Sequence, residues 1–227
     1  MIAPLAVFFL WGMLIDTTPT RDGETINADA YLVVVAGRVL LMAATVLLFG
    51  REILRQFPFR IDWQGVAFGL VGAGVWIGLC TLQLEQTLFG AVGLADWFPA
   101  RESVNPFASY DPGVPLVTFL TLRFALLVVC VPIAEELFLR GFLMRAVEVE
   151  DWPHLPLAKI GTTGLVIGTV YGVATHPGEV IAALAWFSMI TWLMVRSGKF
   201  WNCVLAHAVT NGVLGVYVCW FHQWHLW

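Results

Sequence analysis

Charged side chains are scarce in this chain of 227 residues, at 12% of the sequence, whereas hydrophobic residues make up 59%. A soluble domain carries about 25% charged residues, so this scarcity excludes an ordinary soluble fold and predicts an integral membrane protein. The net charge of -4 is small and no basic stripe is present, which gives no reason to expect a nucleic-acid partner. The four cysteines lie singly in apolar segments without a CxxC pair, so we expect buried free thiols and no disulfide or metal framework.

The apolar runs predict an all-α, polytopic membrane helix bundle of about seven transmembrane helices, forming a single domain over residues 1–227. The first run, MIAPLAVFFLWGMLI, has no positive n-region and no small-residue cleavage site, so we interpret it as a short membrane helix and not as a signal. Residues 83–115 are too polar to span, and we expect a loop there with a partly interfacial helix, the eighth if it is counted. The predicted spans are 2–15, 30–50, 63–82, 116–146, 157–175, 179–195 and 201–221.

The positive side chains indicate how the bundle is oriented. Arg51, Arg55 and Arg60 lie in one short connection between the second and third spans. Because Lys and Arg are enriched in cytoplasmic loops, we place this connection in the cytoplasm. The first loop, residues 16–29, is then outside the membrane and the N-terminus inside.

Residues 131–145, VPIAEELFLRGFLMR, place Glu135, Glu136 and Arg140 inside an apolar run. An ionised acid at the centre of a membrane helix costs about 2.5–3.5 kcal/mol, so each acid needs a partner, a proton or a function. Arg140 lies four residues after Glu136 on the same helix face and is the local partner of that acid. Glu135 has no such local cation, and an ionisable residue inside a membrane span is by default a functional-site hypothesis.

Three further polar side chains occur in or beside the last three spans: His176, His207 and Asn211. His207 and Asn211 are four residues apart and share one helix face. A carboxylate can take a proton from water, an imidazole can share it, and an amide with a second imidazole can donate hydrogen bonds to an oxyanion. The alternative is metal-assisted hydrolysis, with a divalent metal such as zinc held by His176, His207 and Glu135, although the sequence contains no HExxH motif.

Each of these groups taken alone has a structural explanation. Glu136 and Arg140 can form a buried salt bridge that only fixes their helix. A single intramembrane histidine is more often a packing group, and a lone Asn211 is more often interhelical glue worth about 0.6 kcal/mol. Their occurrence together on three helices of one small protein favours an active site.

At these residues the sequence resembles the CPBP intramembrane protease family, the CAAX prenyl endopeptidases and bacteriocin-processing enzymes. The family pattern is EExxxR, then FxxxH, then HxxxN, and the first and third motifs stand here at residues 135–140 and 207–211. In the second motif His176 is present, Gly172 stands four residues before it, and the nearest aromatic residue, Tyr171, comes one residue earlier. The resemblance covers about residues 114–221, the expected catalytic core, and in outline looks like the bacterial branch associated with exosortase and PEP-CTERM protein sorting.

The resemblance implies an intramembrane endopeptidase of the bacterial inner membrane. Glu135 would activate the water with the help of His176, and the Glu136–Arg140 pair would orient the site. His207 and Asn211 would stabilise the oxyanion. The implied substrate is a membrane-associated or lipidated protein, and the implied partners are the lipid bilayer and an exosortase sorting system.

Two other functions are compatible with the same polar cluster. A non-catalytic membrane immunity or sorting-accessory protein would use the cluster for structure, and its activity would survive Glu135→Gln. A small transporter or proton-coupled channel would use the carboxylates as a relay, and it predicts inverted repeats that the sequence does not show.

The depth of His176 is a difficulty for the protease hypothesis. On a rise of 1.5 Å per residue, a straight fifth span beginning near residue 157 places His176 roughly 10 Å above Glu135 and His207. The three residues can meet if that helix begins later, if it tilts by about 20°, or if the turn after it dips into the bundle.

Overall fold

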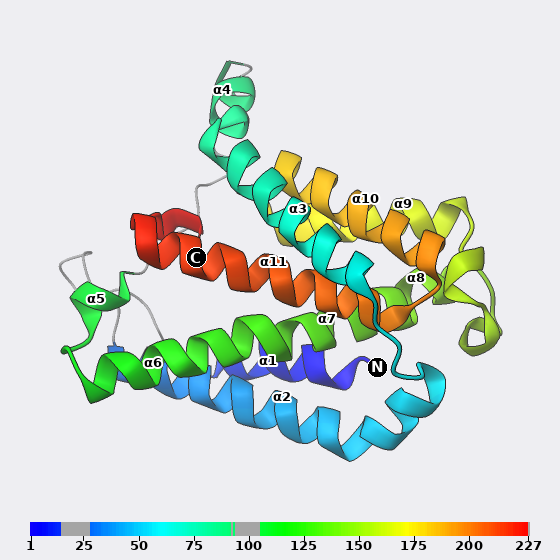
Figure 1. Cartoon of the computed structure of the whole chain (residues 1–227), viewed down its shortest axis with the longest axis horizontal. Coiled ribbons are helices and arrows are strands. Elements are labelled where there is room, and N and C mark those ends of the chain that lie inside the picture. Colours follow the sequence, from blue (N-terminus) through cyan, green and yellow to red (C-terminus); the bar gives the residue numbers. More distant parts are fainter. Residues whose placement is uncertain (15–27, 92, 94–104, 227) are drawn as a thin grey trace.

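The structure, a computed structural model, describes residues 1–14, 28–91, 93 and 105–226. Every regular element in that part of the chain is a helix. Figure 1 shows α1, α2 and α6 packed together on one side of the bundle and α3, α10 and α11 on the other, with α7 beside α11. The helices are α1 (Ala3–Met13), α2 (Ala28–Gln56), α3 (Trp63–Thr81), α4 (Leu84–Ala91), α5 (Pro106–Ser109), α6 (Val114–Ala125), α7 (Val131–Phe138), α8 (Met144–Ala146), α9 (Thr162–Thr175), α10 (Val180–Ser197) and α11 (Phe200–Phe221).

The predicted all-α, polytopic membrane bundle is confirmed. Five helical segments of the described chain are long and apolar enough to cross a membrane: α2, α3, the continuous stretch from α6 to α8, α10 and α11. The two other predicted spans also form apolar helices, but α1 has 11 residues and α9 has 14, which is short for a crossing. Of the about seven spans predicted, five are thus long enough to cross by length alone, and α1 and α9 are the two short apolar helices.

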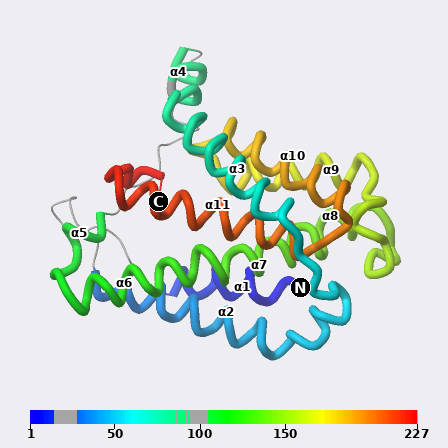
Figure 2. The backbone as a smooth tube through the Cα atoms, viewed as in Figure 1, coloured from blue at the N-terminus to red at the C-terminus, as the bar shows by residue number. Residues whose placement is uncertain are grey.

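Two helix boundaries differ from those predicted in ways that matter here. Helix α2 continues through Arg51 and Arg55 to Gln56, so these two arginines lie in the last turns of a helix and not in a connection. Helix α9 begins at Thr162, later than the predicted residue 157. The predicted interfacial region is described only as α4 and α5, and Figure 2 shows α4 standing away from the bundle. The predicted outer loop lies outside the described residues over 16–27, and so do residues 92 and 94–104.

The fourth predicted span is one continuous helical stretch, Val114–Ala146, interrupted by two π-helical segments. The first π segment, Leu126–Cys130, precedes α7, and the second, Leu139–Leu143, follows it. Such segments insert an extra residue into a turn and shift the direction of the side chains beyond them. Both acids lie on the short α-helix between the two segments, and Arg140 lies in the second segment.

Glycines let the helices that carry the site approach one another closely. A Cβ atom at Gly69 of α3 would lie 2.7 Å from the carbonyl oxygen of Ala206 on α11. A Cβ atom at Gly164 of α9 would lie 2.5 Å from the carbonyl oxygen of Met144. Neither contact could accommodate a larger residue without a backbone shift, so both glycines act as small residues at helix interfaces in a membrane protein.

Glutamates from outside α9 and α10 bind the first turns of these two helices. The residue before α9 is Gly161, which has no side chain to serve as a cap, and the Gly164 N–H donates instead to Glu148. The Ile181 N–H of α10 donates to the carboxylate of Glu85, a buried residue of α4, over 2.8 Å. A carboxylate at a helix N-terminus satisfies an orphan N–H and interacts favourably with the helix dipole.

The starts of α3 and α11 are joined at one end of the bundle. Asp62 caps α3 by accepting a hydrogen bond from the Gln64 N–H. Its carboxylate also accepts hydrogen bonds from the side-chain nitrogens of Asn202 and Lys199, over 2.9 and 2.6 Å. The hydrogen bond from Lys199 is the main reason why the pKa of Asp62 lies below its ordinary value. This cluster fixes the position of α11, and thereby of the residues that α11 contributes further along.

Candidate active site

The Glu136–Arg140 pair is the most deeply buried part of the candidate site. Both side chains are essentially inaccessible to solvent, and the Arg140 Nη1 group lies 2.6 and 2.7 Å from the two carboxylate oxygens of Glu136. The Nη2 group also donates to the backbone carbonyl of Phe187 on α10 over 3.4 Å. The i,i+4 pair predicted from the sequence therefore ties α7 to α10, and one guanidinium neutralises one carboxylate.

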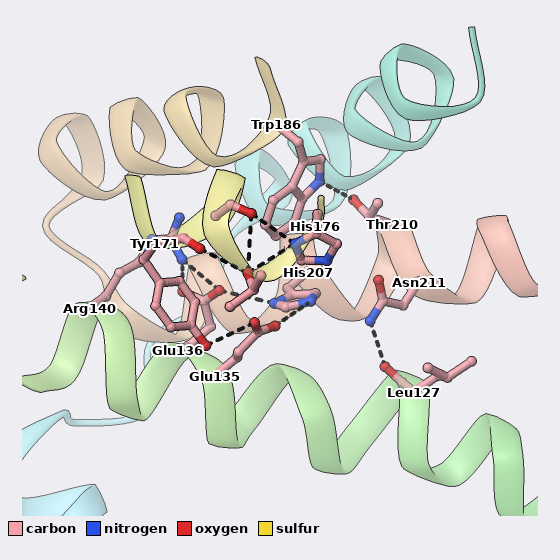
Figure 3. Close-up of polar contacts among 12 residues, drawn as sticks. Leu127, Glu135, Glu136, Arg140, Tyr171, His176, Trp186, His207, Thr210 and Asn211 are labelled. Carbon is pink, nitrogen blue, oxygen red and sulfur yellow. Dashed lines mark hydrogen bonds and ion pairs between the residues drawn. The ribbon is translucent and has the colours of Figure 1, made fainter. Parts of the chain in front are cut away.

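Glu135 points away from this pair, and its partners come from other helices. Its Oε1 atom accepts a hydrogen bond from the Tyr171 hydroxyl over 3.2 Å, and Oε2 lies 3.6 Å from Nε2 of His207 (Figure 3). Its side chain is 13% exposed, against 1% for Glu136. Of the two adjacent acids, Glu135 is therefore the one that water and a substrate can reach.

His207 lies between the two acids. Its Nδ1 atom is 3.0 Å from Oε1 of Glu136, a carboxylate that can only accept, so this nitrogen carries a proton. Nε2 then faces Glu135 and can hold a second proton. The indole ring of Trp186 packs edge-on against the imidazole, with ring centres 4.7 Å apart, and donates to Thr210, whose hydroxyl donates to the Gly69 carbonyl. His207 is thus held both by its charge partner and by packing.

His176 ends α9 at the edge of the same site. Its Nδ1 atom lies 3.0 Å from the backbone carbonyl of Gly172, which accepts only, and 3.0 Å from the Thr175 hydroxyl, which can donate or accept. In the tautomer that donates from Nδ1 to the carbonyl, Nε2 is the acceptor nitrogen. The late start of α9 at Thr162 is one of the three ways in which we expected His176 to reach the depth of Glu135. His176 lines the same cavity as Glu135, so the difficulty of its depth does not arise.

The absence of an aromatic residue at position 172 has a structural explanation. A Cβ atom at Gly172 would lie 2.3 Å from the ring of Phe187, so this ring occupies the space that a side chain at 172 would need. The Phe187 ring is 2% exposed and its centre is 5.6 Å from that of the His176 imidazole. The aromatic groups beside His176 thus come from α10 and from α3, whose Trp76 ring centre lies 5.2 Å from that of the imidazole, while Tyr171, one residue too early for the motif, donates to Glu135.

Asn211 lies on the cavity wall one turn beyond His207, and its amide is partly committed. Its Nδ2 atom donates to the backbone carbonyl of Leu127 over 2.9 Å (Figure 3). In the first π segment Val131 donates to the carbonyl of Leu126, five residues back. The next donor in that register would be residue 132, which is Pro132 and has no N–H. Because of this proline, the Leu127 carbonyl is left to accept from the Asn211 side chain. The contact uses one N–H of the Asn211 amide, and the second N–H of the same amide is not used by it.

The four predicted residues that could contact a substrate line one cavity of about 150 Å³. A water molecule needs about 10–15 Å³ on this measure, so the cavity has room for several. Glu136 and Arg140 lie behind this wall. Tyr171, Trp186 and Phe187 also hold or touch the site, and no role was predicted for them. In the sequence they could be noticed only as aromatic residues near the second motif. The cavity-lining residues predicted from the sequence are Glu135, His176, His207 and Asn211.

The sequence left open whether a metal ion is held by His176, His207 and Glu135. Within the described residues no three His, Cys, Asp or Glu side chains are grouped in a way that could ligate one. The Nδ1 atom of each histidine is directed to an acceptor, a contact that metal-ligating histidines also make, and Nε2 of His207 faces the Glu135 carboxylate at 3.6 Å.

One comparison with known proteins found a match. The family model described as Rce1-like, type II CAAX prenyl endopeptidase, matches residues 117–213. That stretch is less than half of the chain, runs from α6 into α11 and contains all six predicted site residues. The chain has no match among the curated proteins or the solved structures. With five helices able to cross a membrane, the match supports an integral membrane protein similar to the CAAX-type intramembrane proteases.

Proposed function

We propose that this protein is an intramembrane endopeptidase in which Glu135 activates water to hydrolyse a peptide bond of a membrane-associated or lipidated protein substrate. The proposal depends on one observation, the different surroundings of the two adjacent acids. Glu136 is closed off and paired with Arg140, whereas Glu135 lines a cavity together with two histidines and an asparagine. A buried salt bridge that served structure alone would not need the second acid, at a cost of about 2.5–3.5 kcal/mol in a membrane.

In the proposed reaction the Glu135 carboxylate removes a proton from water while the water oxygen attacks the carbonyl carbon of the scissile bond. The Nε2 acceptor of His176 orients the water. The tetrahedral oxyanion that forms accepts a hydrogen bond from the second amide N–H of Asn211, and from Nε2 of His207 when that ring carries its second proton. When the intermediate collapses, the C–N bond breaks and the leaving amine takes the proton that Glu135 had removed. The products are a new carboxyl terminus and a new amino terminus.

The distance of 3.6 Å between Glu135 and Nε2 of His207 is longer than a hydrogen bond. It leaves both groups accessible to a bridging water, and catalytic hydrogen bonds often tighten only when substrate is bound. The Tyr171 hydroxyl holds the other carboxylate oxygen of Glu135. A base held on one side and open on the other is the arrangement that water activation requires.

Purified protein in nanodiscs, incubated with a library of quenched fluorescent peptides, tests the proposal. Glu135→Gln preserves the size of the side chain and removes the base, so we expect cleavage to fall by at least about a hundredfold with folding intact. Glu52→Gln, at an exposed position of α2, is the matched control and should cleave as the wild type does. Equal cleavage by wild type and Glu135→Gln, or no cleavage by either, would remove the proposal in favour of a non-catalytic accessory or immunity protein. A bacterial inner-membrane location and an exosortase partner stay predictions.

A further inference from the structure

A second cavity, of about 430 Å³, lies at the end of the bundle where α2 ends and α11 begins. Its wall comes from three connections: the segment between α2 and α3, the segment between α8 and α9, and the turn between α10 and α11. These connections lie together at the right of Figure 1. One water needs about 10–15 Å³ on this measure, so the cavity has room for a phosphate group. None of the six predicted site residues lines it.

The ionisable side chains that line this cavity are all basic. Those of the described wall are Arg60, Arg145, His154 and Lys199. The Lys199 ammonium is balanced by the Asp62 carboxylate over 2.6 Å. His154 likewise faces the carboxylate of Asp151 over 2.7 Å. The two arginines differ from these residues, because the ion pairs among the described residues involve neither Arg60 nor Arg145.

Arg145 is a buried cation whose partners carry no charge. Its residue is 3% exposed, and its Nε, Nη1 and Nη2 atoms each donate to a backbone carbonyl. These three contacts fix the side chain but do not neutralise it, and they use three of the five N–H groups of a guanidinium. A buried charge is costly unless an opposite charge accompanies it. An anion in the cavity would therefore be favoured by Arg145, and by the exposed Arg60 on the same wall.

The remainder of the wall is largely apolar. Phe57 and Phe200 are buried there and stack with ring centres 4.3 Å apart. The Arg145 guanidinium lies 5.6 Å from the centre of the Phe57 ring, so the cationic and apolar surfaces adjoin. The phosphate and glycerol groups of a lipid present the same combination. Basic pockets between membrane helices bind lipid head groups on the cytoplasmic side, which is where the arginine-rich connection between α2 and α3 is predicted to lie.

We propose that this cavity binds a phosphate-bearing anion, with Arg60 and Arg145 as its cationic ligands. The apolar surface beside them favours the head group of an anionic phospholipid over free phosphate, which shares the same chemistry. The phosphate oxygens accept from the guanidinium groups, whose planar fork of donors suits them. A bound lipid joins three connections of the chain and so steadies the start of α11, the helix that carries His207 and Asn211. The proposal does not depend on the proposed peptidase activity.

Titration of the full-length protein in a neutral maltoside detergent tests the proposal. The probes are dihexanoyl phosphatidylglycerol, dihexanoyl phosphatidylcholine and inorganic phosphate, and microscale thermophoresis reports binding. The two lipids share their acyl chains and a phosphate, but the choline ammonium cancels the charge. We expect saturable binding of phosphatidylglycerol about tenfold or more tighter than that of phosphatidylcholine, as charged hydrogen bonds provide. Inorganic phosphate that binds about tenfold more weakly than phosphatidylglycerol identifies the lipid as the ligand, and equal binding identifies free phosphate.

Variants then assign the binding to the cavity. Arg60→Gln should weaken the binding of phosphatidylglycerol by roughly fivefold or more, and Arg60→Lys should keep most of it because the charge remains. Arg51→Gln is the matched control, since Arg51 is exposed near the same end of α2 but does not line the cavity. It should bind as the wild type does. Equal binding of the two lipids, no saturable binding of either anion, or equal losses in Arg60→Gln and Arg51→Gln would overturn the proposal.

Discussion

Replacing Gly172 with Ala is the most direct test of how the second motif is built in this protein. The new Cβ atom would lie 2.3 Å from the Cγ and Cδ2 atoms of Phe187, whereas ordinary contacts are 3.4–4 Å. The ring must therefore retreat by about 1 Å or more. Phe187 is 2% exposed and packs against Trp186, with ring centres 4.9 Å apart, so it has little room to move. Overpacking of this kind typically costs about 1–3 kcal/mol.

The displacement should also reach the residues of the candidate site. The backbone carbonyl of Phe187 accepts a hydrogen bond from Arg140, and the Phe187 ring lies 5.6 Å from the His176 imidazole. Gly172→Ala should thus lower the free energy of unfolding by about 1–3 kcal/mol, measured by denaturant titration in micelles, and should reduce peptide cleavage. Adding Phe187→Leu should recover part of both losses, with a coupling energy above about 0.5 kcal/mol in the double-mutant cycle.

Gly74→Ala is the matched control for this prediction. Gly74 lies within α3, and a Cβ atom there would meet no other atom within 4 Å. Since alanine is the better helix former by about 1 kcal/mol, Gly74→Ala should be neutral or stabilising. The reasoning is refuted if the two Gly→Ala variants behave alike, or if the effects of Gly172→Ala and Phe187→Leu simply add.

Three other changes test how the site is supported. Glu85→Ala removes the acceptor for the Ile181 N–H and should lower the free energy of unfolding by about 1–2 kcal/mol in the same titration, whereas the exposed Glu52→Ala should not. The hydrogen bond from Lys199 lowers the pKa of Asp62, so this contact stabilises the protein above about pH 4. The stabilisation is lost as the pH falls through the lowered pKa. Asp62→Asn should therefore be less stable than wild type at pH 7, and the difference in the free energy of unfolding should shrink below about pH 4. A zinc chelator should leave peptide cleavage unchanged, because no three suitable ligands converge in the described chain, and inhibition reversed by added zinc would contradict this.

The sequence was sufficient for features that depend on local spacing. The i,i+4 relation placed Arg140 on Glu136, and the same spacing placed His207 and Asn211 on one face of α11. Apolar run lengths located all seven apolar helices, since burial in lipid demands long uninterrupted hydrophobic segments. These are properties of one helix at a time, so they can be read without knowing how the helices pack.

Contacts between helices could not be predicted in the same way. The substitution of Phe187 for an aromatic residue at position 172 depends on the packing of α10 against α9, which no motif spacing records. The commitment of Asn211 to the Leu127 carbonyl depends on a π segment followed by Pro132, and sequence rules for α-helices do not predict that register. The glutamate that binds the start of α10 lies 96 residues away from it in the sequence.

Residues 135–140 carry two acids and one cation, and this imbalance explains why contacts from other helices converge on Glu135. Arg140 can neutralise only Glu136, so the charge on Glu135 must be met by groups from other helices. The structure supplies a hydroxyl from Tyr171 on α9 and an imidazole from His207 on α11, together with a cavity large enough for water. Removing any one of these should weaken the others, because each is held by the same carboxylate pair. The effects of Glu135 and His207 substitutions on cleavage should accordingly be far from additive, as is usual for residues that act as a unit.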